Sequence, residues 1–172
     1  MADTDAGAEV DADLHLRRPV EADHARLVRV VDDWWGGRHL RHLLPRLWLQ
    51  HFTGTSWIAE TEEGALAGFL IGFVSADQPT VAYVHMVGCS PNRRGRGLGR
   101  RLHTAFADDV RARGVRELRA ITWAGNRPSI AFHMALGFRV DDGPGTQRVY
   151  GTTAYTDYEG DGEDIVVFHR EA

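Results

Sequence analysis

The chain has 172 residues, of which 43% are apolar and 26% charged, a composition typical of a folded globular domain. Its formal net charge of −4 argues against a dedicated nucleic-acid-binding protein, which usually carries an excess of basic residues. All 20 basic residues are arginine, and the absence of lysine excludes a P-loop nucleotide site and Schiff-base chemistry. The single cysteine, Cys89, excludes an internal disulfide.

The N-terminal region predicts a disordered acidic tail over residues 1–13, followed by a single domain over residues 14–172. This tail lacks the apolar stretch of a secretory signal, and no apolar run in the chain approaches the length of a membrane span. We therefore expect a cytoplasmic protein with no membrane partner.

The spacing of apolar residues predicts a mixed α/β domain in which a helix follows the central strand. Strands are expected at residues 14–20, 56–60, 66–75, 80–90, 117–123, 138–140 and 165–170. Helices are expected at residues 21–35, 40–52, 98–113 and 126–136, with glycines after three of them as stop signals. The second of these helices is expected to be interrupted, or to begin, near Pro45. Residues 141–163 are predicted to form a long loop that contains at most a short strand at 147–151.

The most informative segment is Arg93–Arg101, which lies between a predicted strand and a predicted helix and holds five of the 20 arginines. Glycine lets backbone amides approach an anion, and a helix N-terminus adds unsatisfied donors and the positive end of its dipole. The segment therefore predicts a site for a pyrophosphate. A dinucleotide fingerprint is excluded, because Arg100 and Leu102 occupy the positions of its third glycine in the two available registers.

Two sequence motifs stand out along the second half of the chain. The pattern R-x-x-G-x-G runs from Arg94 to Gly99, directly after an apolar strand and Ser90-Pro91. A second block, Asn126–Phe138, is an Asn-led helix ending in Leu-Gly-Phe. Together these motifs resemble the GNAT superfamily of N-acetyltransferases. The resemblance implies a mostly antiparallel central sheet of about six or seven strands flanked by about four helices. It also implies acetyl-CoA as the cofactor.

The resemblance assigns the cofactor to residues of both motifs. Backbone amides of the loop would hold the pyrophosphate, the backbone at the end of the central strand would pair with the pantetheine arm, and Asn126 would bond to that arm. The cofactor-binding residues implied in this way are Val87, Cys89, Arg94, Gly95, Arg96, Gly97, Leu98, Gly99, Arg100 and Asn126.

Two histidines are the predicted catalytic residues. Strand alternation puts Tyr83, His85, Val87 and Cys89 on one face, which makes His85 a candidate base for the acceptor amine. His133 occupies the position of a tyrosine that, in many family members, protonates the departing thiolate, and imidazole can also donate a proton. The tyrosines of the late loop are alternative acids: Tyr150, Tyr155 and Tyr158. Covalent catalysis by Cys89 would need a base beside the thiol.

The acceptor pocket is predicted to combine acidic and aromatic side chains, which suit a cationic amine with an apolar body. The candidate residues are Asp32, Trp34, Trp35, Tyr83 and Trp123. The alternative is that the tryptophans are core residues and the acids are solvated. His39 and His42 have no third ligand nearby in sequence, so no metal site is predicted.

The sequence therefore predicts an acetyl-CoA-dependent N-acetyltransferase that acts on a small-molecule or peptide amine by direct attack in a ternary complex. Three alternatives stay open: a non-catalytic acyl-CoA-binding or sensor module, a protein N-terminal acetyltransferase, and a nucleotide- or nucleic-acid-binding domain. The net negative charge disfavours the last of these, and no nucleic-acid partner is expected. The apolar C-terminal segment 165–170 is compatible with a homodimer.

Overall fold

The computed structural model describes residues 13–172, and their contacts form two compact units. Unit 1 contains the residues up to Phe73 and Met86–Val110, and unit 2 contains Val74–His85 and Arg111–Ala172. The predicted acidic tail lies outside the described residues except for Asp13, whose carboxylate pairs with Arg93 at 2.7 Å. The single domain expected over residues 14–172 stays a prediction.

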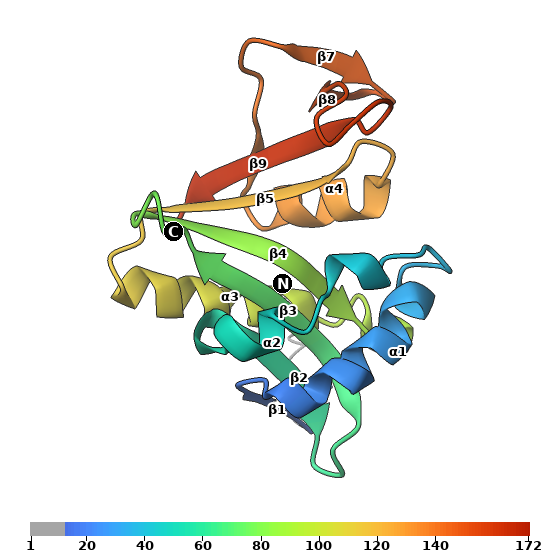
Figure 1. Cartoon of the computed structure of the whole chain (residues 1–172), viewed down its shortest axis with the longest axis vertical. Coiled ribbons are helices and arrows are strands. Elements are labelled where there is room, and N and C mark those ends of the chain that lie inside the picture. The colour runs from blue at the N-terminus through green and yellow to red at the C-terminus, as the bar shows by residue number, and fades with distance from the viewer. Residues whose placement is uncertain (1–12) are drawn as a thin grey trace, which may run out of the picture. The chain divides into compact units, whose positions relative to one another are not determined.

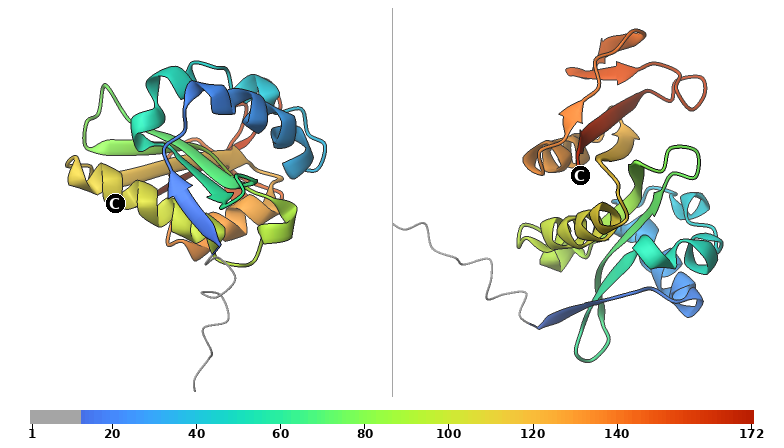
Figure 2. Two further views of the ribbon diagram at one scale, coloured as in Figure 1. Left: turned by 90° about the horizontal axis from the view of Figure 1, so that it is seen from below. Right: turned by 90° about the vertical axis from the view of Figure 1, so that its left-hand side faces the viewer.

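Unit 1 is built on antiparallel strands that carry helices on both faces (Figure 2). Phe69 and Ile71 belong to one apolar cluster with Leu27 and Val31 of the first helix. A Cβ at Gly68, the residue before Phe69 and thus on the alternate face, would lie 3.0 Å from Leu98 of the long helix. The elements are β1 (Leu14–Arg17), α1 (His24–Trp34), α2 (Trp48–His51), β2 (Trp57–Thr61), β3 (Leu66–Val74) and α3 (Leu98–Ala112), with the second half of β4 (Val81–Cys89).

The helix predicted over residues 40–52 is interrupted near Pro45, as expected, and its helical part is shorter than predicted. The chain instead forms a short 3₁₀ turn at Arg41–Leu43 and the single turn α2. Pro45 separates them, because a proline disfavours helical backbone in the residue before it. Leu44 accordingly has φ −122° and ψ 57°.

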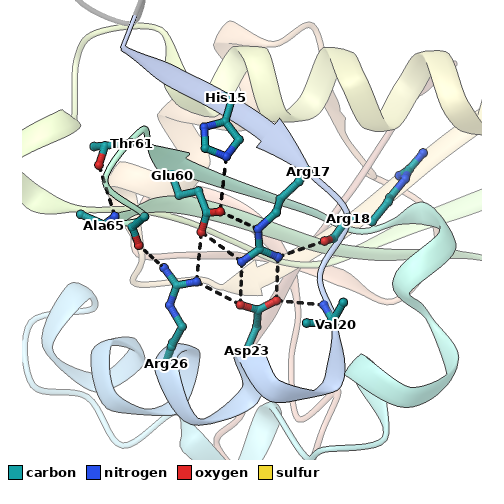
Figure 3. A network of polar contacts seen from close by, with 10 residues as sticks. His15, Arg17, Arg18, Val20, Asp23, Arg26, Glu60, Thr61 and Ala65 are labelled. Atoms are coloured by element: carbon teal, nitrogen blue, oxygen red, sulfur yellow. Dashed lines mark hydrogen bonds and ion pairs between the residues drawn. The ribbon is translucent and has the colours of Figure 1, made fainter.

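A polar network joins the start of unit 1 to α1 and β2 (Figure 3). Arg17 binds Asp23 through two parallel contacts of 2.8 Å and also binds Glu60 at 2.6 and 3.0 Å. Arg26 donates to both carboxylates, at 3.1 and 3.0 Å. Asp23 is buried, with 3% of its surface exposed, so its charge depends on these partners.

Replacing Asp23 with alanine is expected to lower the free energy of unfolding by about 3 kcal/mol, because Arg17 and Arg26 lose a buried counter-charge. Urea unfolding at pH 7 measures the change. Asp33→Ala is the matched control, since Asp33 is exposed on α1, which begins directly after Asp23, and it should cost less than about 0.5 kcal/mol. Equal losses in the two variants would contradict the prediction.

The same network makes the stability of unit 1 depend on pH. Hydrogen bonds from Arg17 and Arg26 outweigh burial and lower the pKa of Glu60 from 4.5 to about 2. A carboxyl with a lowered folded-state pKa stabilises the fold above its unfolded value, and that contribution declines as the pH falls from about 4.5 toward 2.

Unit 2 is a mixed sheet with one helix along it, as the neighbouring β5, β9 and α4 show in Figure 1. The first half of β4 pairs in parallel with β5, which pairs antiparallel with β9. His133 of the helix stacks on Phe168 of β9, so the helix covers the face that carries Phe168. The elements are β5 (Glu117–Trp123), α4 (Arg127–Ala135), β6 (Arg139–Val140), β7 (Thr146–Val149), β8 (Thr152–Tyr155) and β9 (Ile165–Glu171).

The long loop predicted over residues 141–163 contains the hairpin β7–β8, with antiparallel pairs from Thr146↔Tyr155 to Val149↔Thr152. Its two turn residues, Tyr150 and Gly151, have φ values of 48° and 86°, as expected for a type I′ turn. A tyrosine is unusual at such a position, so the sequence carries no standard signal for this turn.

The predicted fold class is confirmed. Within residues 13–172 the fold is mixed α/β, with nine mostly antiparallel strands and four helices. The strands outnumber the predicted six or seven because the late segment forms a hairpin. None of the helices in this described part is long and apolar enough to cross a membrane.

Candidate active site

The glycine-rich loop of unit 1 runs from the end of β4 to the N-terminus of α3. Gly95 and Gly97 have φ values of 73° and 84°, and a Cβ built on either would meet no atom within 4 Å. The backbone amide of Arg101 donates to the carbonyl of Gly97 at 2.9 Å, and this is the first hydrogen bond of α3. The amides of Leu98, Gly99 and Arg100 therefore precede the helical bonding pattern, as anion-binding helix ends require. This open, donor-rich turn fits a pyrophosphate.

The side chain of Arg94 stabilises this loop from within unit 1. Its Nε donates to the carbonyl of Cys89 at 3.2 Å, and its Nη2 donates to the carbonyl of Trp34. Arg96 and Arg100 are exposed on the same segment. Arg94 thus ties the loop to the end of α1, a contact between distant residues that no sequence spacing indicates. The predicted cofactor role of the Arg94 amide stays a prediction.

The alternation predicted for β4 is present. Ala82, Val84 and Met86 are buried, whereas the candidate-site residues of the other face are half-buried: Tyr83, His85, Val87 and Cys89. The hydrogen-bonded register with β5 runs from Val81↔Glu117 to Val84↔Ala120, and His85 is the next residue of the strand. His85 and Val87 thus stand two residues apart on one face of β4.

Tyr83 lies in the polar part of unit 2. It is the partner of Arg119 across the parallel strands, and both residues are half-buried. Burial raises the pKa of the Tyr83 hydroxyl, Tyr158 and Glu159 raise it further, and the charge of Arg119 opposes them. The late loop therefore places charged and polar groups within electrostatic range of Tyr83.

Asn126 caps α4, as its place before the helix predicts. Its side-chain oxygen accepts from the amide of Ser129 at 3.4 Å, and its Nδ2 donates to the hydroxyl of Thr122 at 3.0 Å. Helix capping alone is therefore a sufficient reason for an asparagine at residue 126. Its predicted contact with the cofactor arm is a separate role and stays a prediction.

His133 is buried in α4, where its ring stacks on Phe168 at 4.8 Å and touches Phe138 edge-on. Its Nδ1 lies 2.8 Å from the carbonyl of Ser129, so Nδ1 carries the proton and donates there. Burial lowers the pKa of the imidazole despite this hydrogen bond. These contacts favour a packing role, and the predicted role as general acid stays untested.

Replacing His133 with phenylalanine separates the two roles. If His133 only packs, phenylalanine retains the stacking and we expect turnover within about twofold of wild type. The variant should also lose part of the acid-induced destabilisation, since a histidine with a lowered pKa stabilises the fold only above its unfolded value of 6.5. A drop in kcat of about 100-fold would instead identify His133 as the acid.

Three predicted acceptor residues lie in unit 1 around the end of α1. Trp34 is 8% exposed and stacks on Phe69 in the core, so the alternative of a core tryptophan holds for this residue. Trp35 is half-buried against Phe69, and the carboxylate of Asp32 accepts from the amide of Leu40 and binds Arg41 at 2.7 Å. Asp32 therefore holds the turn after α1, and its acceptor role stays a prediction.

Two glycines, for which the sequence alone indicates no role, leave room for tryptophan rings packed against them. A Cβ at Gly88 would lie 2.4 Å from the ring of Trp35, and a Cβ at Gly125 would lie 2.2 Å from the ring of Trp123. Trp123 is 39% exposed and meets Tyr150 of the hairpin edge-on, with ring centroids 5.9 Å apart. The pair Trp123–Tyr150 thus forms an exposed aromatic surface in unit 2.

Histidine, cysteine and carboxylate side chains do not gather into a metal-binding group of three or more anywhere in residues 13–172.

Comparison with known proteins places this fold and loop in a family. The model of the acetyltransferase (GNAT) family matches residues 24–138, and the chain belongs to this family. L-2,4-diaminobutyric acid acetyltransferase of Nocardia farcinica is 33% identical over 124 residues, a match that covers 72% of this chain and 64% of that protein. The chain thus spans less than two thirds of the length of this relative.

Solved structures share the fold. Ard1 from Thermoplasma volcanium aligns with a TM-score of 0.74 at 17% identity, covering 94% of this chain and 99% of that one. Diaminobutyrate acetyltransferase from Paenibacillus lautus, solved with L-2,4-diaminobutyric acid and coenzyme A, aligns with a TM-score of 0.66 at 22% identity, covering 90% and 93%. At these identities the alignments show the common fold alone.

Proposed function

We propose that this chain transfers the acetyl group of acetyl-CoA to a primary amine of a small molecule, by direct attack in a ternary complex. The observation that carries the proposal is the open glycine turn that leads into the N-terminus of α3, where backbone donors suit a pyrophosphate. Membership of the acetyltransferase (GNAT) family supports it. The diaminobutyric acid acetyltransferases among its relatives support a small-molecule acceptor.

Acetyl-CoA, when bound, supplies an activated acetyl thioester. The amides of Arg94–Gly99, together with Arg100, would hold its pyrophosphate. Val87 and Cys89 would offer backbone groups to its arm, and Asn126 would bond to that arm. His85 removes a proton from the acceptor ammonium, since only a neutral amine can attack the acetyl carbonyl carbon. The proton that goes to the departing sulfur comes from His133 or from a tyrosine of the late segment: Tyr150, Tyr155 or Tyr158.

The test is release of free CoA from acetyl-CoA in the presence of a panel of primary amines and peptides. Intersecting lines in initial-rate plots support the ternary complex, and an unchanged rate for Cys89→Ala supports direct attack. Parallel lines would instead indicate an acetylated enzyme. Tight binding of acetyl-CoA without turnover of any amine would identify the non-catalytic sensor, and turnover of peptides alone would identify a protein acetyltransferase.

We also propose a cytoplasmic homodimer. The apolar sequence of residues 165–170 motivates the dimer. Its contact would lie outside the edges of β9, because β9 pairs with β5 along one edge and with β6 and β8 along the other. Light scattering of the full chain tests this proposal, and a monomeric mass at micromolar concentration would contradict it.

A further inference from the structure

One face of unit 2 is not used by the helix of that unit. The register β4–β5–β9 sets Tyr83 beside Arg119 and Arg119 beside His169, all half-buried on the face opposite to Phe168. Two residues after Arg119 on β5, Ile121 pairs with Val167 of β9 on the same face. Two residues after Tyr83 on β4, His85 also lies on this face. We call this surface the Arg119 face, defined by Tyr83, His85, Arg119, Ile121 and His169.

Charge and polarity change in steps along the Arg119 face. The step that continues from His85 is apolar and contains Ile121 and Val167. The next step, level with Tyr83, contains Arg119 and His169. Along these strands the acidic residues come one step further away, where Glu117 pairs with Glu171. Glu159 of the late segment also lies within electrostatic range of Tyr83. Among the charged residues of these strands, Arg119 is therefore the nearest to His85, the proposed base. The apolar residues Ile121 and Val167 lie one step along from Arg119 on the same face.

Glu117 fixes the guanidinium of Arg119 on this surface. Its carboxylate accepts from Nε at 2.5 Å, and this contact uses one of the five N–H donors of an arginine. The planar fork of a guanidinium binds a carboxylate with two parallel hydrogen bonds, which a lysine could not do. The exposed part of the side chain, 42%, gives a ligand access to the group.

The separation on the strands sets the size of the ligand. Residues two apart on a strand are about 6.6 Å apart and neighbouring strands are about 4.8 Å apart, which puts the Cα atoms of His85 and Arg119 roughly 8 Å apart. Both side chains leave the same face. A short molecule with its amine at His85 and a carboxylate a few bonds away can therefore reach Arg119.

We propose that the acceptor is an amine that also bears a carboxylate, and that Arg119 is the residue that selects it by binding this carboxylate. The inference rests on the proposed acetyl transfer and names the substrate class of the same site. Ile121 and Val167 contact the carbon chain between the two groups, and His169 supports the carboxylate beside Arg119.

The experiment compares amines that differ only in the carboxylate. L-2,4-Diaminobutyrate and 1,3-diaminopropane form one pair, and ornithine and putrescine form a second. We expect wild type to favour the carboxylate-bearing member of each pair at least 10-fold in kcat/KM. Arg119→Gln should lower kcat/KM for that member roughly 10- to 100-fold and change the value for its partner less than about twofold.

Arg116→Gln is the matched control, because Arg116 is exposed just before β5 and falls on the opposite face by strand alternation. Arg116→Gln should leave kcat/KM unchanged for both members of each pair. Arg119→Lys should show more selectivity for the carboxylate-bearing member than Arg119→Gln, but less than wild type. An equal loss for both members in Arg119→Gln would indicate a structural role and overturn the proposal.

The outcomes also separate this inference from the proposed function. Turnover confined to amines without a carboxylate, or equal turnover of both members, overturns the role of Arg119 and leaves acetyl transfer standing. No release of CoA with any amine overturns both proposals.

Discussion

Replacing His85 with glutamine is expected to lower kcat at neutral pH by about 100-fold, the usual scale of general-base catalysis. Glutamine has nearly the same length and still forms hydrogen bonds, but it cannot accept a proton from an ammonium. In wild type the rate should fall as the pH falls, because a protonated imidazole is no longer a base. The variant should lose this acid limb, which stopped assays across the pH range would show.

A general loss of structure would lower the rate without changing the shape of the pH profile, so the shape is the decisive observation. His51→Gln is the control, since His51 is an exposed histidine at the end of α2. It should leave both rate and profile unchanged. The Kd for acetyl-CoA should also be the same in His85→Gln and wild type. A variant with an unaltered profile would show that a water chain or another residue performs the deprotonation.

The local features of this fold were predictable from the sequence because their causes are local. Alternation along β4 placed His85 and Val87 on one half-buried face, since successive side chains of a strand point to opposite sides. Asn126 caps α4 because its short side chain reaches the amide of Ser129 three residues later. The glycines of the loop adopt positive φ, which residues with a Cβ rarely do.

Features that depend on distant partners were not predictable. Arg94 resembles a phosphate ligand in sequence, yet its guanidinium binds the carbonyl of Trp34, 60 residues away. Trp34 and Trp35 are equivalent in sequence, but one stacks in the core and the other lies against Gly88. The step pattern of the Arg119 face appears only when the register of three strands is known, because β5 and β9 are separated by more than 40 residues.

Replacing Gly97 with valine is expected to weaken acetyl-CoA binding by about 100-fold. The φ of 84° is a left-handed conformation that a β-branched residue adopts only with strain, so the loop should relax toward negative φ. Such a rotation turns the neighbouring amides away from the position of the pyrophosphate, and these amides supply the fixed donors of the site. Isothermal titration calorimetry of the full chain measures the Kd.

Gly64→Val separates this loss of binding geometry from strain alone. Gly64 lies in the turn between β2 and β3 of the same unit, has a φ of 80°, and also has open space around an added Cβ. The two variants should therefore lose similar stability, roughly 1–2 kcal/mol for a non-glycine residue in this conformation. Only Gly97→Val should lose affinity. Equal affinities in the two variants would mean that the turn before α3 does not hold the pyrophosphate, and acetyl-CoA would need another site.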